Sequence, residues 1–486
     1  MKIKMNFRAS FVLGSLVSLA VIGSAAAADF PVKAKAVEYV KVCSLYGAGF
    51  YYIPGTDTCL KIGGYLRVDA TVNGASVYDQ PSWSGPAGQW SRLRNEFATR
   101  SRLELSIDTR TATEYGVLRT YGEWSSNYTT GDPVAGGTVG VYFAFIQFAG
   151  FTVGKAISQF DAQWDGYPGN LTSFLLGGAD DVTGVNQLSY TADFGQGITA
   201  AISAQDAVAY YGSNLWNMSG ATAATYATGV YGTNSYGGNS VPDIVGMVRV
   251  DQAWGQFQAS AAVHNIHASY YSTAETSGHP DDAWGWAGQL ALSIKNIPTG
   301  PGDVINMSAG YANGASRYVL GGVTGNTFAM CGGSSVAYQS IAFASSADGV
   351  FAGTSAATGT AIEKSALWGF RGAYNHNWDQ YWNSALFGAY TSIRYPGAAQ
   401  ALICAPVAGI ITGTCNPNAN IAQTGIVTRW TPVKNLTFSG EIMYTLLDQK
   451  KSGTIALPAI GTKPAALYEF KDQGTWTFGM NVRRNF

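Results

Sequence analysis

The amino-acid sequence predicts an all-β fold, a transmembrane antiparallel up-and-down β-barrel of 16 strands. Three observations lead to this prediction. Only 12% of the 486 residues are charged, about half of the usual share of roughly 25%, whereas 60 are glycine and 13% are aromatic. Polar and apolar residues alternate over many short segments, as in strands with two different faces. The connections between these segments are alternately short and long, which is typical of periplasmic turns and external loops.

Sixteen segments show this alternation, and no stretch of comparable length shows helical periodicity. We expect strands over residues 60–69, 97–109, 114–124, 141–148, 151–157, 184–193, 198–206, 243–252, 256–264, 284–295, 303–312, 365–377, 380–393, 421–431, 436–447 and 475–486. The long connections include 70–96, 125–140, 158–183, 207–242, 313–364 and 394–420, and the short ones include 110–113, 149–150 and 194–197. An even number of strands leaves both termini on the periplasmic side.

The segment RSRLELSIDTR, residues 100–110, shows the alternation clearly. One face carries three arginines and two acids, and the other is mostly aliphatic. In a soluble protein, Leu103, Leu105 and Ile107 would pack into a core. In a membrane barrel, a charged side chain that faces lipid costs roughly 2 to 4 kcal/mol at the bilayer midplane. We therefore expect the charged face to line the lumen and the aliphatic face to contact lipid.

The N-terminus has the three parts of a secretory signal peptide. A basic region over residues 2–8 is followed by an apolar run over residues 11–22 and by a small-residue cleavage site that ends at Ala28. The apolar run is too short, and too interrupted by Gly and Ser, for a transmembrane helix. We expect residues 1–28 to be removed and residues 29–486 to form one barrel domain, whose segment 29–59 precedes the first strand on the periplasmic side.

Charge argues against a nucleic-acid partner. The full chain has a formal net charge of −1, and removing residues 1–28 takes away three basic residues and no acid, which leaves about −4. Proteins that bind nucleic acid normally carry a strongly basic surface. The sequence has none, and we expect no nucleic-acid binding.

Five cysteines follow the signal peptide, and export places them in an oxidising compartment. None forms a CxxC motif, and none pairs with a histidine at zinc-finger spacing. Our hypothesis is one disulfide between Cys43 and Cys59 that fixes the N-terminal segment, and a second between Cys404 and Cys415 that closes a loop. Cys331 would then remain unpaired.

Three stretches resemble a known family. They are AVEYVKVCSLYGAGFYYIPGTDTCLKIGGYLRVD (residues 36–69), NQLSYTADFGQGITAAISAQD (residues 186–206) and the closing TWTFGMNVRRNF. They resemble the alphaproteobacterial general porins of the rhizobial and Brucella type, and together they extend over the whole mature chain. The long segments 207–242 and 313–364 match that family poorly, which leaves the properties that depend on these loops open.

The resemblance implies a 16-stranded porin in the bacterial outer membrane, a homotrimer that passes small hydrophilic solutes without a cofactor. Its surroundings would be outer-membrane lipid and lipopolysaccharide. The terminal Phe486 looks like the assembly signal of outer-membrane barrels, with the barrel-assembly machinery as partner.

Charged side chains at a narrow point set the selectivity of a pore. The basic candidates gather in the first three strands and at the end of the first long loop, and two acids accompany them. These pore-lining candidates are Arg67, Arg92, Arg94, Arg100, Arg102, Glu104, Asp108, Arg110 and Arg119. We expect this cluster to act as a filter. The alternative is that the charges only solvate the lumen wall and pair with one another.

The third long loop, residues 158–183, is the expected constriction loop. In porins of this architecture, the third external loop folds into the barrel and narrows it. Here it has no basic residue and contains four acids, Asp161, Asp165, Asp180 and Asp181. We expect these acids to face the arginine wall and to create a transverse electric field. The alternative is a solvated external loop.

No motif for catalysis or for a metal site stands out. The chain has no GxSxG, Walker A or HExxH motif, and His264 and His267 are three residues apart without a third ligand. The sequence therefore favours a passive diffusion channel that is not an enzyme and holds no metal. The alternatives are a substrate-specific channel for sugars or anions, a barrel adhesin and a barrel enzyme.

Overall fold

The computed structural model describes residues 41–74, 91–172, 175–180, 182–226, 229–321 and 326–486. The expected signal peptide, residues 1–28, lies outside the described residues, as does Asp181. None of the helices in the described part of the chain has the length and hydrophobicity needed to cross a bilayer.

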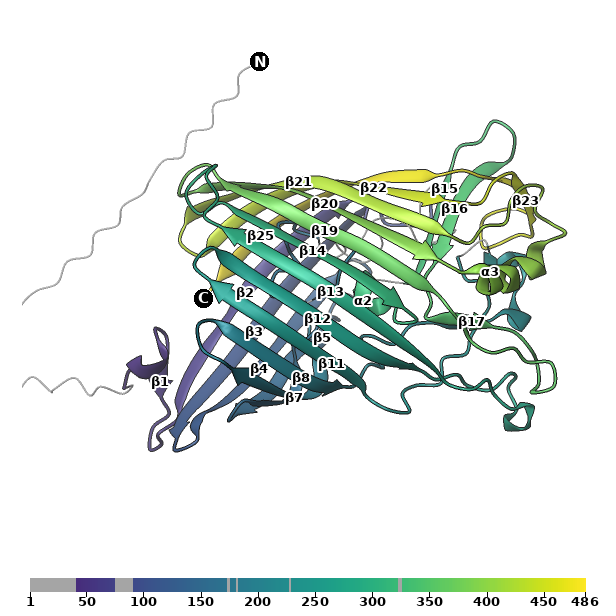
Figure 1. Ribbon diagram of the computed structural model, residues 1–486. Coiled ribbons are helices and arrows are strands. Elements are labelled where there is room, and N and C mark those ends of the chain that lie inside the picture. Colours follow the sequence, from purple (N-terminus) through teal and green to yellow (C-terminus); the bar gives the residue numbers. More distant parts are fainter. Residues whose placement is uncertain (1–40, 75–90, 173–174, 181, 227–228, 322–325) are drawn as a thin grey trace, which may run out of the picture.

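A closed antiparallel barrel dominates the structure (Figure 1). A 17-stranded sheet consists of the two-residue β1 (Tyr51–Tyr52) and sixteen barrel strands. The barrel closes where β2 pairs with both β3 and β25. The barrel strands are β2 (Cys59–Val72), β3 (Phe97–Thr113), β4 (Gly116–Thr129), β5 (Thr138–Phe148), β6 (Phe151–Ala156), β7 (Val185–Asp193), β8 (Ile198–Gln205), β11 (Asp243–Gln252), β12 (Gly255–Ile266), β13 (Ala283–Lys295), β14 (Val304–Asn313), β19 (Ala366–Asn377), β20 (Trp382–Arg394), β21 (Ala419–Val433), β22 (Leu436–Gln449) and β25 (Gln473–Asn485).

The predicted fold class is confirmed, and each of the sixteen predicted strands has its counterpart. The predicted edges differ most around β3 and β4. Residues 110–113, expected as a connection, belong to β3, and residues 125–129, expected in a loop, belong to β4. The inner face of a barrel strand is polar, so polar residues such as Ser125 can continue the strand. The polar sequence from Ser125 onward therefore does not indicate where β4 ends.

The two faces of the barrel wall differ as the sequence predicts. On β3, Leu103 is 41% exposed on the outer surface, whereas Asp108 on the inner face is only 8% exposed. Arg67 on β2 likewise faces inward and is 7% exposed. The row of apolar side chains on the outside is therefore suited to lipid, and the charged row faces the lumen.

Short turns gather at one end of the barrel, called here the turn end, and long loops at the other, the loop end (Figure 1). The turn between β5 and β6 consists of Ala149 and Gly150, with φ angles of 50° and 86°. Asn435, between β21 and β22, has a φ of 67°. Such left-handed conformations reverse the chain within two residues and match the twist of the strands.

At the loop end, the described residues of the segments 207–242, 313–364, 394–418 and 450–472 pack into what we call the loop cap. It contains two small sheets whose strands come from different loops. Tyr231, Phe343 and Tyr395 lie fully buried in its core. Its strands are β9 (Leu215–Asn217), β10 (Thr233–Asn234), β15 (Thr327–Gly332), β16 (Gln339–Ser345), β17 (Gly349–Phe351), β18 (Glu363–Lys364), β23 (Thr454–Leu457) and β24 (Ala466–Phe470).

The described helices are short, and none of them is part of the barrel wall. The 3-10 helices are η1 (Ser44–Tyr46), η3 (Met218–Gly220), η4 (Glu275–Ser277) and η5 (Ala405–Val407), and the α-helices are α1 (Ala223–Tyr226), α2 (Arg317–Leu320) and α3 (Gly397–Cys404).

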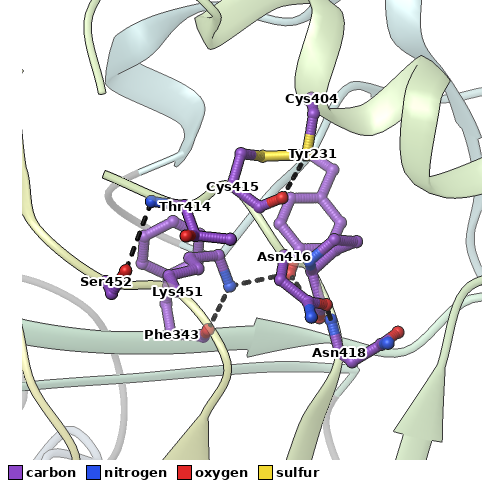
Figure 2. Close-up of a disulfide and its surroundings, with 10 residues drawn as sticks. Tyr231, Phe343, Cys404, Thr414, Cys415, Asn416, Asn418, Lys451 and Ser452 are labelled. Carbon is purple, nitrogen blue, oxygen red and sulfur yellow. Dashed lines mark hydrogen bonds between the residues drawn. A yellow bond between two sulfur atoms is a disulfide. The ribbon is translucent and has the colours of Figure 1, made fainter. Parts of the chain in front are cut away.

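The two disulfides are those expected from the sequence. Cys43 bonds to Cys59, which ties the segment with η1 and β1 to the start of β2 at the turn end. Cys404, at the end of α3, bonds to Cys415 within the loop cap (Figure 2). Cys331 is a buried thiol on β15.

Candidate channel constriction

Three arginines form one row on the inner wall. Arg67 on β2 is directly opposite Arg483 on β25 and Arg102 on β3 in the strand register. All three belong to the inward-facing set of their strands. Like charges placed directly opposite each other destabilise a sheet, so this arginine row is not explained by the stability of the barrel.

The three guanidinium groups have different partners. Arg67 forms an ion pair of 2.6 Å with Asp69, whose other oxygen accepts from Arg100. Arg102 donates to Asn127 over 2.6 Å and lies 5.3 Å from the centre of the Tyr142 ring. Arg483 donates to Asn485 and lies 3.8 Å from the Tyr65 ring centre, close enough for a cation–π contact. In the described part of the chain, only Arg67 of this row has a carboxylate as ion-pair partner.

Two glutamates lie next to this row toward the turn end. Glu104 follows Arg102 by two residues on the same face of β3, and its register partners are Tyr65 and Ser125. Glu123 on β4 is opposite Ser106, which makes it a diagonal neighbour of Glu104. It accepts a hydrogen bond of 2.5 Å from the Tyr121 hydroxyl. Neither glutamate forms an ion pair with any cation among the described residues.

The arginine row and the two glutamates border a lumen cavity of about 590 Å³. Its other charged residue is Arg429 on β21. The opposite boundary comes from the segment between β6 and β7, residues 157–184, which we call the inner segment. Among its described residues, those that line the cavity are the uncharged Tyr167, Asn170, Leu171 and Val182.

The inner segment is held against the wall by inward-facing polar side chains. Asn306 on β14 and Asn375 on β19 both donate to the Pro168 carbonyl, over 2.8 and 2.9 Å. Glu441 on β22 accepts from the backbone amides of Leu171 and Thr172. Further contacts of this kind come from Gln258, Gln289, Arg371, Gln423 and Arg429. These contacts supply partners for backbone groups that have no strand to pair with.

The inner-segment acids that the structure describes do not line the cavity beside the arginine row, so the expectation was wrong for these three. Asp161, Asp165 and Asp180 are at most 3% exposed, and none of them lines the cavity. Asp161 accepts from the Tyr211 hydroxyl, Asp165 from the Ala162 amide and Gln289, and Asp180 from the Val182 amide. Short carboxylates satisfy amides of an irregular backbone well, and here they stabilise the bend of the segment itself.

Burial has a further effect on this segment. It raises the pKa of the fully buried Asp165 carboxyl above its ordinary value, against the opposing charge of Arg371. A carboxyl group in such a place contributes to the folding of the segment rather than to the field in the pore. The acids of the cavity are Glu104 and Glu123, which come from the barrel wall.

The remaining predicted residues lie above and below the cavity. Arg100 shares Asp69 one row toward the loop end. Arg92 is exposed at the rim of the loop end, and Arg94 contacts Asn73 and Glu96 there. At the turn end, Asp108 forms ion pairs with both Arg110 and Arg119. The predicted charges therefore spread along the lumen, and three of them, Arg67, Arg102 and Glu104, border the cavity.

Sequence reasoning missed Arg483, Glu123 and Arg429. The signal for Arg483 was present, because it has the opposite parity to the apolar row of the closing strand and must point inward. Glu123 alternates in the same way along β4. Arg429 had no such signal, since its role depends on the path of the inner segment.

A family model described as "Porin subfamily" matches residues 29–479. The chain belongs to this porin family. Porin Omp2b of Brucella suis is 32% identical over 278 residues, which make up 54% of this chain and 67% of the relative. Porin Omp2b of Brucella melitensis has the same identity and coverage. The resemblance seen in the sequence is thus confirmed, and the protein is a porin of the bacterial outer membrane.

A solved structure supports the architecture of this porin. The outer membrane channel DcaP of Acinetobacter baumannii superposes with a TM-score of 0.59, covering 90% of this chain and 99% of that one. The two sequences are only 15% identical, so this likeness concerns the fold alone. The superposition therefore supports the barrel architecture of this porin.

Proposed function

We propose that this porin is a passive diffusion channel whose selective passage is the cavity between the arginine row and the inner segment. The observation that carries the proposal is the lumen cavity of about 590 Å³, which is bordered by charged wall residues on one side and by the inner segment on the other. A water-filled path lined by polar groups replaces the apolar barrier of the bilayer, and charge at its narrow point filters the solutes.

The channel needs no chemical step. A solute crosses by diffusion, and the wall supplies hydrogen-bond partners in place of part of its hydration. We therefore propose that the protein is not an enzyme. The filter differs from the expected one, because both signs of charge come from the barrel wall.

Membership of the porin family and the apolar outer surface support a proposal for export and assembly. We propose that residues 1–28 are removed on export, that residues 29–486 form the mature domain, and that three copies associate in a membrane of lipid and lipopolysaccharide. The closing strand supports recognition by the barrel-assembly machinery. Its outward side chains Trp476, Phe478 and Met480 are exposed, and so is the terminal Phe486.

Uptake by liposomes tests the proposed function. Liposomes that contain the refolded protein are placed in isotonic sugars of increasing size, and the rate of swelling is measured. We expect the rate to fall smoothly with solute size and to rise linearly with solute concentration. The absence of swelling would overturn the proposal, and saturable uptake of one sugar would favour the substrate-specific alternative.

A further inference from the structure

The charges of the lumen wall are ordered along the channel. The arginine row, Arg483–Arg67–Arg102, lies toward the loop end, and Glu104 and Glu123 follow toward the turn end. Arg102 and Glu104 are two residues apart on one face of β3, a separation of about 7 Å along the strand. Positive and negative groups are therefore displaced from each other mainly along the wall.

Four of these charges have hydrogen-bond or aromatic partners or a tyrosine neighbour, but no ion-pair partner among the described residues. Asp69 pairs with Arg67 and Arg100, and Asp108 pairs with Arg110 and Arg119. By contrast, the ion pairs among the described residues include none formed by Arg102, Arg483, Glu104 or Glu123. Each of these four borders the cavity.

Among the described residues, the remaining boundary of the cavity adds one further charge without an ion pair, that of Arg429 on β21. The four inner-segment residues that line it are uncharged. Arg429 donates to the carbonyls of Gly169 and Asn170 in that segment. Among the described residues, the charged groups that border the cavity therefore all come from the barrel wall.

We propose that this cavity is a recognition site for zwitterionic solutes, with the carboxylate at Arg102 and Arg483 and the ammonium group at Glu104 and Glu123. The class that fits is a short peptide or an ω-amino acid, whose two charges lie roughly 5 to 7 Å apart, close to the spacing of i and i+2 on a strand. This inference rests on the proposed function and names the substrate class of the same site.

The charge pattern discriminates between solute classes. A simple anion gains from the arginines and is repelled by the glutamates, and a simple cation meets the reverse. A neutral solute gains from neither. A zwitterion of the right length places its carboxylate near the arginines and its ammonium group near the glutamates at the same time. It thereby replaces part of the hydration of both pairs of side chains.

The test compares two solutes of nearly equal size in proteoliposomes at pH 7. The probes are radiolabelled glycylglycine, a zwitterion, and radiolabelled N-acetylglycinamide, which is neutral. Because each exposed ionic contact contributes only modestly, we expect wild-type protein to pass the zwitterion at least about threefold faster than the neutral solute. In E104Q/E123Q and in R102Q/R483Q, this ratio should fall to near unity.

Two further variants serve as controls. R102K/R483K keeps both charges and should keep most of the preference, and E114Q, at the exposed turn after β3, should keep all of it. A smaller folded fraction lowers the uptake of both solutes by the same factor, so it cannot produce the expected fall of their ratio. A wild-type ratio near unity, or a ratio that both double variants leave unchanged, would overturn the inference. If neither solute passes, it is the proposed channel function that fails.

Discussion

Arg102 and Arg483 carry the positive charge of the proposed filter. They flank Arg67 on adjacent strands, and both are held in place by amide and aromatic neighbours instead of carboxylates. Their positive charge is thus available to permeating ions. Arg67 contributes less, because Asp69 compensates its charge over 2.6 Å.

Removing this charge should change ion selectivity. We expect Arg102→Gln and Arg483→Gln each to lower the permeability of chloride relative to potassium by about twofold, which corresponds to a contribution below 1 kcal/mol for a solvated charge. The measurement is the reversal potential in a KCl gradient. Arg92→Gln, at the exposed rim, is the matched control and should leave it unchanged. Equal reversal potentials for all three variants would remove the arginine row from the filter.

Lys451, in the loop cap, is a charged residue of a different kind (Figure 2). Its ammonium group donates to the Phe343 carbonyl over 2.9 Å and lies 4.2 Å from the centre of the Phe343 ring. The Tyr231 hydroxyl is its other hydrogen-bond partner. Burial without a carboxylate lowers the pKa of Lys451 to about 7.

This pKa predicts how the stability of the cap depends on pH. An unfolded lysine has a pKa of about 10.4, so the unfolded cap binds more protons between pH 7 and pH 10. The cap should therefore become more stable as the pH rises through this window. Amide hydrogen exchange of the cap segments at pH 7 and pH 9, corrected for the intrinsic rates, measures the change. Lys451→Met should abolish the pH dependence, whereas Lys450→Met, next to it and paired with Asp448, should not.

We propose that the inner segment is the element that sets the width of the passage. It has no regular structure of its own and relies on side chains from β12 to β22, among which Glu441 accepts from two consecutive amides. Leaving two buried amides without partners costs about 1 to 3 kcal/mol each. The position of this segment therefore depends on a few identifiable contacts.

Loss of one such contact should widen or destabilise the passage. We expect Glu441→Ala to raise the mean single-channel conductance and the open-channel noise, because residues 171 and 172 can move away from the wall. Glu114→Ala, in an exposed turn, is the control. A Glu441→Ala channel with the conductance and noise of the wild type would show that the segment is held without this contact.

The elements could be predicted from the sequence to different extents. Each barrel strand has its own alternation, so strands such as β3 and β25 are visible locally. The packing of the inner segment cannot be predicted locally. An aspartate such as Asp165 looks the same in the sequence whether its carboxylate faces water or accepts a hydrogen bond from an amide. The loop cap is also invisible, since the Tyr231 and Phe343 of one core come from loops more than a hundred residues apart.

At the scale of the whole molecule, the barrel, the inner segment and the loop cap form one path with a charged narrow point. The barrel supplies the polar wall, the inner segment reduces the opening, and the cap packs together at the loop end (Figure 1). The two sites of greatest charge, the arginine row and the cluster around Asp108, lie at successive depths of the same wall. A solute that crosses the channel therefore passes the arginine row and the cluster around Asp108 one after the other.

Planar-bilayer recording of the refolded protein tests the central claim most directly. If the protein is a trimeric diffusion channel, current should appear in steps grouped in threes, and the conductance should rise linearly with KCl concentration without saturation. A protein that inserts into the bilayer and conducts no current would contradict the account.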